Sequence, residues 1–389
     1  MSKITRIEIV DFRFEVDNIA QMGGGQRLGY SKGAKLPVTK NAIVIETDDG
    51  LRGEYVTNLV ASPATRGEMA MLAPLLIGRD HSEREEIFDD LKREIRQWSG
   101  LGQGPLDIAL WDLEGKALGA SISRLLGGYR ARLPAYASTY LGDDAGGLDS
   151  PEAYEAFAEE CYALGYRAFK IHGWNDGDAK REVANVLHCA AALEGRMILM
   201  LDACCQLRRF SDALYVGRAC DEAGYFWYED PMRDSGRSAH LHRKLRQFLS
   251  TPILITEYVR GLEPKADIIV AEATDYLRVN PEYDQGITGA IKTAHLAEAF
   301  GLDCEVHACG PAHRHVMSAM RNSNFYEVAL VGPDMPNMVA PVYACGYSDQ
   351  LNCIGSDGTV PVPAGPGLGV TYDWDFIAHH SVDRQVFAA

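Results

Sequence analysis

Two basic side chains, Lys170 and His172, lie two residues apart in an apolar run at residues 168–172. On a β-strand this spacing points both side chains to the same face of the sheet. A lysine cation close to a histidine favours the neutral imidazole, which can accept a proton near neutral pH. The structural alternative is a salt-bridged lysine beside a hydrogen-bonded histidine, so the meaning of the pair depends on what surrounds it.

Three acidic residues close three later apolar runs: Asp202, Glu229 and Glu257. At the carboxyl ends of parallel barrel strands these carboxylates would converge, and they would repel one another unless a cation lay between them. Ligation by oxygen alone favours Mg²⁺ over zinc or copper. A single aspartate after a strand is more often a helix cap, but three in register indicate a metal site.

Two further candidates stand near the ends of the last strand runs. His307 closes the run at 303–308, and Glu327 lies in the run at 325–328. In a barrel, His307 would reach a bound ligand from a different flank than His172 does. Glu327 would either hydrogen-bond a substrate carboxylate, if it is protonated, or pair with Lys170.

The elements that must position these side chains are repeated β/α units. Their polar ends, from Asp202 to His307, recur every 23 to 28 residues. An open doubly wound sheet also alternates strands and helices, but eight units are the number that closes a parallel barrel. The expected strands are 134–140, 167–172, 197–203, 225–229, 252–257, 275–280, 303–308 and 325–328.

Residues 1–130 have a different pattern and are expected to form an α+β domain. Alternating runs at 4–16 and 41–56 predict an antiparallel meander, and 83–98 and 105–118 have helical periodicity. The glycine-rich stretch near residues 20–30 is interpreted as a mobile lid, with a plain surface linker as the alternative. The barrel is assigned to 131–355. Residues 356–389, in a Pro- and Gly-rich region without a predicted helix, are expected to pack back on the first domain.

The net charge, the cysteine pattern and the lengths of the apolar runs limit the classes of function to consider. The 389 residues carry a net charge of −16, which argues against a nucleic-acid or anionic-membrane surface. Nine cysteines without a CxxC pair indicate neither a disulfide framework nor a thiolate zinc site, so a reduced cytoplasm is expected. The N-terminus lacks the pattern of a signal peptide, and no apolar run approaches the length of a membrane span.

The order of these motifs resembles the enolase superfamily, and within it the mandelate racemase subgroup. The shared order is a lysine dyad, an aspartate, Glu-Asp-Pro, Thr-Glu and then a histidine. Residues 107–128 are similar to the segment that links that family's capping domain to its barrel, and residues 366–370 to the end of the cap. The resemblance implies an α+β capping domain on a modified TIM (β/α)-barrel.

The resemblance also implies an essential Mg²⁺ held by Asp202, Glu229 and Glu257 and bound to a substrate carboxylate. A base would remove the proton α to that carboxylate, and the metal would stabilise the enediolate. His172 stands where the family usually has a second lysine, so it would be the base and Lys170 would tune it. His307 would be the second acid/base, and Glu327 would contact the substrate carboxylate.

Two positions depart from the family pattern. Asn280 stands where an aspartate usually pairs with the histidine of the seventh strand. An amide can orient His307 but cannot stabilise its cation, so His307 should be the weaker base and the better acid. Cys204 stands where relatives often carry an asparagine that touches the substrate.

The expected activity is dehydration of a sugar acid to a 2-keto-3-deoxy acid. Unequal bases favour this reaction over racemisation or epimerisation, and a lactone cycloisomerase is a further alternative. A barrel that binds Mg²⁺ and a carboxylate without turnover is the alternative from another class. The family resemblance also implies a homo-oligomer.

Overall fold

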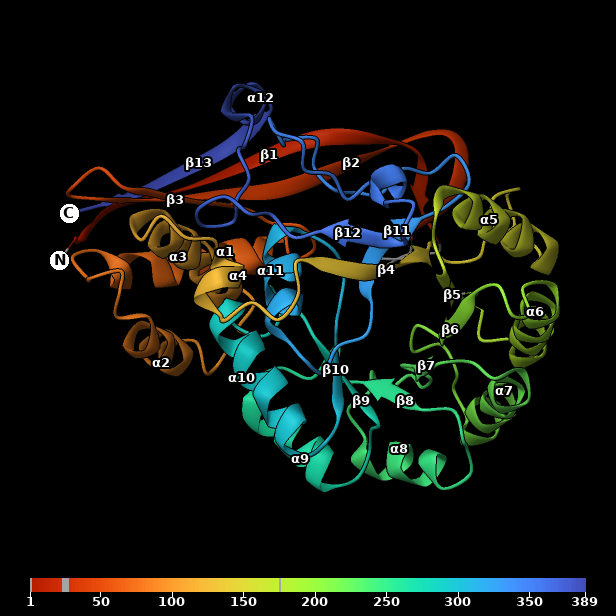
Figure 1. Ribbon diagram of the computed structural model, residues 1–389. Coiled ribbons are helices and arrows are strands. Elements are labelled where there is room, and N and C mark those ends of the chain that lie inside the picture. The colour runs from red at the N-terminus through yellow and green to blue at the C-terminus, as the bar shows by residue number, and fades with distance from the viewer. Residues whose placement is uncertain (1, 23–27, 175) are drawn as a thin grey trace.

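The computed structural model describes residues 2–22, 28–174 and 176–389, which form two sheets with their helices (Figure 1). The first sheet is antiparallel in the order β13-β1-β2-β3. Its strands are β1 (Ile4–Gln21), β2 (Leu28–Thr47), β3 (Arg52–Val56) and β13 (Ser381–Ala388). The predicted meander is therefore present, and its turn falls between β2 and β3.

The strands of this meander are longer than expected. β1 continues to Gln21 and β2 begins at Leu28, because the two pair from one end, Ile4 with Thr47, to the other, Gln21 with Leu28. The lid prediction falls largely on residues 23–27, which lie outside the described residues.

Helices follow the meander and pack on it. They are α1 (Pro63–Leu72), a short 3₁₀ turn η1 (Ala73–Leu76), α2 (Arg84–Glu94), α3 (Gln103–Ala117) and α4 (Ile122–Leu125). α3 lies so close to β3 that a side chain at Gly53 would meet the carbonyl oxygen of Ala109 at 2.3 Å. Because only hydrogen fits there, glycine permits this helix-to-sheet contact.

The second sheet contains the eight expected parallel strands. They are β4 (Arg132–Thr139), β5 (Ala168–His172), β6 (Ile198–Asp202), β7 (Tyr228–Glu229), β8 (Ile253–Ile255), β9 (Tyr276–Val279), β10 (Asp303–Val306) and β11 (Tyr326–Val331). They pair in chain order from β4 to β10, and the last strand, β11, returns to pair with the first, β4. The expected (β/α)-barrel class is confirmed.

Each connection between these strands carries a helix. These are α5 (Pro151–Leu164), α6 (Ala179–Ala192), α7 (Phe210–Ala223), α8 (Ala239–Arg246), α9 (Leu262–Val270), α10 (Gly286–Ala299) and α11 (Pro311–Ala319). The start of α5 is set by local chemistry, since Ser150 Oγ accepts from Ala153 N at 3.2 Å and Pro151 occupies the first turn.

The segment after β11 contains more regular structure than its composition predicts. It includes η2 (Leu351–Cys353), β12 (Thr359–Pro361) and a helix, α12 (Trp374–His379). The expectation of no helix in residues 356–389 is wrong, because Asp373 accepts from Phe376 N at 2.9 Å and caps a short helix whose Ile377 is buried. β13 then pairs with β1, which places the two ends of the chain near each other (Figure 1).

One buried carboxylate joins the first sheet to the barrel. Glu282, in the loop after β9, accepts hydrogen bonds from Tyr55 OH (2.7 Å), Asn58 N (2.5 Å) and Leu59 N (2.7 Å). The segment that follows β3 therefore lies against the carboxyl end of the barrel strands. Contacts of this kind fix where the first sheet sits over the barrel.

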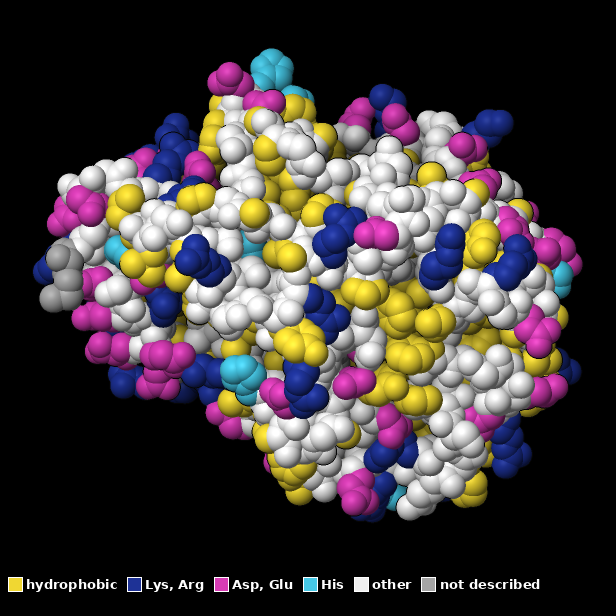
Figure 2. Space-filling model, viewed as in Figure 1, with side chains coloured by type: hydrophobic (Ala, Val, Ile, Leu, Met, Phe, Trp, Pro, Cys, Tyr) yellow, Lys and Arg dark blue, Asp and Glu magenta, His cyan; other side chains and the backbone are white. Residues whose placement is uncertain are grey.

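The surface matches the acidic composition. On the face drawn in Figure 2, acidic and basic side chains are interspersed, and Lys and Arg do not gather into one patch. Among the described residues, no helix is long and apolar enough to cross a membrane.

Candidate active site

The three carboxylates predicted to bind a metal meet at one point. Asp202 is the last residue of β6 and Glu229 is the last of β7, and the two are register partners. Glu257 lies two residues beyond the end of β8, after Thr256 with a φ of 93°, so the strand is shorter than predicted. One oxygen from each carboxylate lies within 4.8 Å of those of the other two.

The electrostatics of this cluster suit a cation. Burial, together with the charges of Asp202 and Glu229, raises the pKa of Glu257 to about 7. Burial also raises the pKa of Glu229, although Arg278 and Lys170 oppose the rise. Nearby negative charges make these carboxyl groups hold their protons more tightly. A divalent cation between them would stabilise the ionised form. Oxygen-only ligation at this spacing fits Mg²⁺.

Lys170 and His172 both face Asp202, as their spacing on β5 predicts. Lys170 Nζ lies 2.9 Å from Glu229 Oε2 and 3.6 Å from Asp202 Oδ2. His172 Nε2 lies 3.1 Å from Asp202 Oδ2. Burial would lower the pKa of Lys170, but the surrounding carboxylates hold it well above its usual range. Lys170 is therefore a permanent cation beside the imidazole.

The hydrogen bonds of His172 select its reactive nitrogen. Nδ1 lies 2.6 Å from the carbonyl oxygen of Thr139 and can only donate to it. The backbone is held as well, since Tyr154 OH donates to the His172 carbonyl oxygen. Assigned from this network, Nδ1 carries a proton that it donates to Thr139, and Nε2 is the nitrogen that faces Asp202, whose carboxylate can only accept a hydrogen bond from it.

The opposite assignment holds for His307, which directly follows β10. Asn280 Oδ1 accepts from Glu282 N at 2.8 Å, so the amide nitrogen of Asn280 is the atom that faces His307. That nitrogen lies 3.0 Å from His307 Nδ1, which must accept. Burial holds the pKa of His307 well below its usual range. The neutral ring therefore carries its proton on Nε2, 3.5 Å from Glu257 Oε1.

Glu327 forms ion pairs rather than standing free. It lies second in β11, not at the strand's end as predicted, because the apolar run continues to Val331. Its oxygens lie 3.0 Å from Lys170 Nζ and 3.2 Å from Arg278 Nη2, and Ala308 N donates to it at 2.6 Å. Burial would raise its pKa, but these cations hold it well below the usual range.

Of the two expectations for Glu327, the pairing with Lys170 is the one found. A contact between Glu327 and a substrate carboxylate stays a prediction.

Arg278, which sequence reasoning missed, joins these groups inside the barrel. It is fully buried on β9. Nε lies 2.6 Å from Glu229 Oε1, and Nη2 lies 3.2 Å from Glu327 Oε2 and 2.9 Å from Tyr136 OH. A buried guanidinium of this kind orients carboxylates with fixed geometry. Its only sequence signal is a lone arginine within an apolar strand.

Asp230 is a second residue that sequence reasoning missed. It is buried next to Glu229, and neither of its side-chain oxygens has a hydrogen-bond partner among the described residues. Burial and the charges of Glu257 and Asp202 raise its pKa well above the usual range, so it is a neutral acid.

The charges of the site leave room for one divalent ion. Asp202, Glu229, Glu257 and Glu327 are four carboxylates, and Lys170 and Arg278 are the two cations among them. The carboxylates therefore outnumber the cations that contact them, and a divalent ion such as Mg²⁺ would supply positive charge there.

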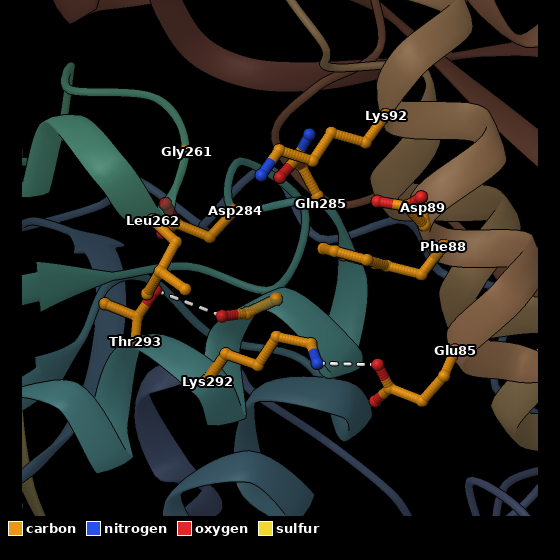
Figure 3. A pocket seen from close by; sticks show the side chains of 11 residues that line it. Glu85, Phe88, Asp89, Lys92, Gly261, Leu262, Asp284, Gln285, Lys292 and Thr293 are labelled. Carbon is orange, nitrogen blue, oxygen red and sulfur yellow. Dashed lines mark hydrogen bonds and ion pairs between the residues drawn. The ribbon is translucent and has the colours of Figure 1, made fainter.

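A separate hollow lies on the surface of the barrel. Figure 3 shows it between α2 and the start of α10, with Glu85, Lys92 and Lys292 on its walls. Lys292 Nζ lies 2.6 Å from Glu85 Oε2 across it. None of the site residues described above lines this hollow, so it is not the candidate active site.

Comparison with protein families agrees with both parts of the fold. A family model described as enolase C-terminal domain-like matches residues 153–376. A second, described as the N-terminal domain of mandelate racemase and muconate lactonizing enzyme, matches residues 37–127.

Individual relatives match most of the length of this chain, although their sequence identity to it is low. The crystal structure of a D-glucarate dehydratase from Agrobacterium tumefaciens, complexed with magnesium, is 31% identical, with a TM-score of 0.86 and coverage of 98% of this chain and 99% of that chain. D-gluconate dehydratase of Thermoproteus tenax is 26% identical over 346 residues, which are 84% of this chain but 66% of that protein. D-galactarolactone cycloisomerase of Agrobacterium fabrum is 27% identical over 350 residues, 86% of this chain and 89% of that protein.

Proposed function

The chain belongs to the enolase superfamily, in its mandelate racemase subgroup, and on this basis we propose that it dehydrates a sugar acid in a Mg²⁺-dependent reaction. The product is a 2-keto-3-deoxy acid. The single observation that carries this choice of reaction is that Nδ1 donates a hydrogen bond in His172 and accepts one in His307.

The two histidines present different atoms to a ligand between them. His172 donates through Nδ1 to Thr139, so Nε2 is the nitrogen that exchanges protons, and it takes a proton from carbon after releasing the one it donates to Asp202. His307 accepts at Nδ1 from Asn280, so its Nε2 already carries a proton. Both reactions use one base and one acid in each turnover, but a racemase needs each group to take either role, because it must work on both enantiomers. The unequal partners of the two Nδ1 atoms fix one role for each histidine and therefore favour dehydration.

The metal site is assigned to Asp202, Glu229 and Glu257, whose spacing and excess charge fit a divalent ion. When bound, Mg²⁺ supplies Lewis acidity that makes the proton α to a coordinated carboxylate easier to remove. Lys170 and Arg278 hold Glu229 in place and keep Glu327 ionised.

The proposed steps balance in protons. His172 Nε2 takes the α-proton, and His307 Nε2 gives its proton to the β-hydroxyl as the carbon–oxygen bond breaks, which releases water. The Asn280 amide stabilises the His307 ring as that proton leaves, since it donates to Nδ1. The enol that results tautomerises to the keto acid, and both histidines return to their first state through solvent.

The proposed substrate class rests on the names of the relatives and not on contacts between a substrate and the site residues. The relative at 31% identity is a D-glucarate dehydratase, and another acts on D-gluconate by its name. We infer an aldaric or aldonic acid. One relative is named a D-galactarolactone cycloisomerase, so opening or closing of a lactone at the same site is the alternative reaction.

The test is to incubate the protein with Mg²⁺ and a set of aldonic and aldaric acids and to assay for 2-keto acids. Formation of a keto acid that stops with EDTA supports the proposal. Inversion at the α-carbon without keto acid would favour a racemase or epimerase, and conversion of a lactone alone would favour a cycloisomerase. Either outcome would contradict the assignment as a dehydratase.

A further inference from the structure

A second metal-binding group stands beside the carboxylate cluster and has a different chemistry. A ring nitrogen of His172, one Asp202 oxygen and Cys204 Sγ all lie within 4.8 Å of one another. The group shares only Asp202 with the proposed Mg²⁺ ligands. It combines an imidazole, a carboxylate and a thiol, which is a donor set that Mg²⁺ does not take.

The loop after β6 brings the thiol into this position. Cys204 has a φ of 49°, a conformation that L residues rarely adopt, and its backbone nitrogen donates to Asp202 Oδ1 at 2.7 Å. Its sulfur returns to 3.7 Å from the Asp202 carbonyl oxygen. The turn therefore folds Sγ back against the strand end. Cys204 is only partly buried, so ions in solution can reach it.

We propose that His172, Asp202 and Cys204 form a binding site for thiophilic divalent ions such as Zn²⁺ and Cd²⁺, distinct from the Mg²⁺ site. Tetrahedral ligand atoms around zinc lie about 3.6 Å apart. The 3.1 Å between His172 Nε2 and Asp202 Oδ2 is close to that value. All three donor atoms lie within 4.8 Å of one another, so one ion could contact all of them, and water or substrate would complete the shell.

Binding releases the protons that the ligand atoms hold. The Cys204 thiol releases its proton to solvent as the metal–sulfur bond forms, and His172 Nε2 releases the proton that it donates to Asp202 and binds through its lone pair. No oxidant or reductant is needed. The bound ion then blocks His172 Nε2, the atom proposed to take the α-proton. Zn²⁺ or Cd²⁺ at this site should therefore inhibit the enzyme, whereas Mg²⁺ at its own site activates it. This inhibition rests on the proposed role of His172, whereas the binding itself does not.

The neighbouring cysteine offers a matched control. Cys205 is also partly exposed and has a φ of 57°, but it is not part of the group. Its backbone nitrogen donates to the carbonyl oxygen of Asp230 at 2.7 Å, which ties it to the strand end that follows Glu229 rather than to Asp202. A thiol that merely bound metal because it is accessible would behave the same at both positions.

Binding is tested by titrating Cd²⁺ into the full-length protein, with Mg²⁺ saturating, and recording the near-ultraviolet thiolate-to-Cd²⁺ absorption. The wild type and Cys205→Ser should show a band that saturates at one equivalent, and Cys204→Ser should lack it. Loss of the band in Cys205→Ser, or its survival in Cys204→Ser, would overturn the proposal. Cys204→Asn serves as the second variant if the serine variant does not fold.

Inhibition is tested separately by adding Zn²⁺ to the enzyme in excess Mg²⁺. The half-inhibitory Zn²⁺ concentration should rise at least about tenfold in the Cys204 variants, because a soft ligand is lost, and should be unchanged in Cys205→Ser. Equal inhibition of all variants would mean that Zn²⁺ acts by displacing Mg²⁺, which contradicts the inhibitory role. If no sugar acid is turned over, the proposed function fails, and the Cd²⁺ band still decides the metal site.

Discussion

Replacing Arg278 by methionine tests whether the buried charge network holds the barrel together. The side chain is fully buried and makes hydrogen bonds to Glu229, Glu327, Tyr136 and the carbonyl of Val306. Methionine has a similar length but no charge, so Glu229 and Glu327 would lose a cation that water cannot replace. Removing one partner of a buried ion pair costs about 3–5 kcal/mol. We expect a loss near the middle of that range, since Lys170 still neutralises part of the charge.

The assay is urea unfolding in EDTA, with the free energy of unfolding taken from the linear region of each curve. Arg132→Met is the matched control, because Arg132 pairs with Asp357 at 3.0 Å on the surface, where both side chains are about half exposed. An exposed pair of this kind contributes about 0–1 kcal/mol. If Arg278→Met and Arg132→Met lower the stability by the same small amount, the reasoning about the buried network is wrong.

Two further substitutions follow from other sites in the barrel. Burial raises the pKa of Glu182 to about 8 from its ordinary value of 4.5, so the folded state holds that proton more tightly than the unfolded state and stability falls as pH rises between those values. Glu182→Gln should therefore be more stable than the wild type at about pH 9, by at most about 5 kcal/mol, with little difference at about pH 5 in thermal unfolding. A constant difference at both pH values would contradict this. Asn280→Asp should place a carboxylate that accepts from His307 Nδ1 and leaves Nε2 free as a base, so dehydration should fall about 100-fold while α-proton exchange persists. Unchanged dehydration would contradict the tautomer assignment.

The barrel strands, and the convergence of the three carboxylates proposed to bind the metal, could be predicted because their signal is local. An apolar run that ends in a carboxylate, repeated at a steady interval, gives both the strand and the position of the side chain at its end. Asp202 and Glu229 show this directly, since each is the last residue of its strand. Glu257 departs by two residues because the chain leaves β8 early.

The interior of the barrel could not be predicted in the same way. Arg278 contacts residues from four other strands, and no spacing along the chain shows which interior layer a side chain occupies. Asp230 is next to Glu229, and only the fold shows that its carboxyl group is buried without a partner among the described residues. The tautomers of the two histidines depend on single hydrogen bonds to Thr139 and Asn280, which residue types alone do not determine.

The central claim is that His172 removes a proton α to a carboxylate, and exchange of that proton with deuterated water tests it most directly. The substrate is any sugar acid that the screen identifies, followed by NMR in the presence of Mg²⁺. We expect exchange in the wild type, loss of exchange in His172→Ala and with EDTA, and continued exchange in His307→Gln. Exchange that survives both His172→Ala and EDTA would contradict the account of the site.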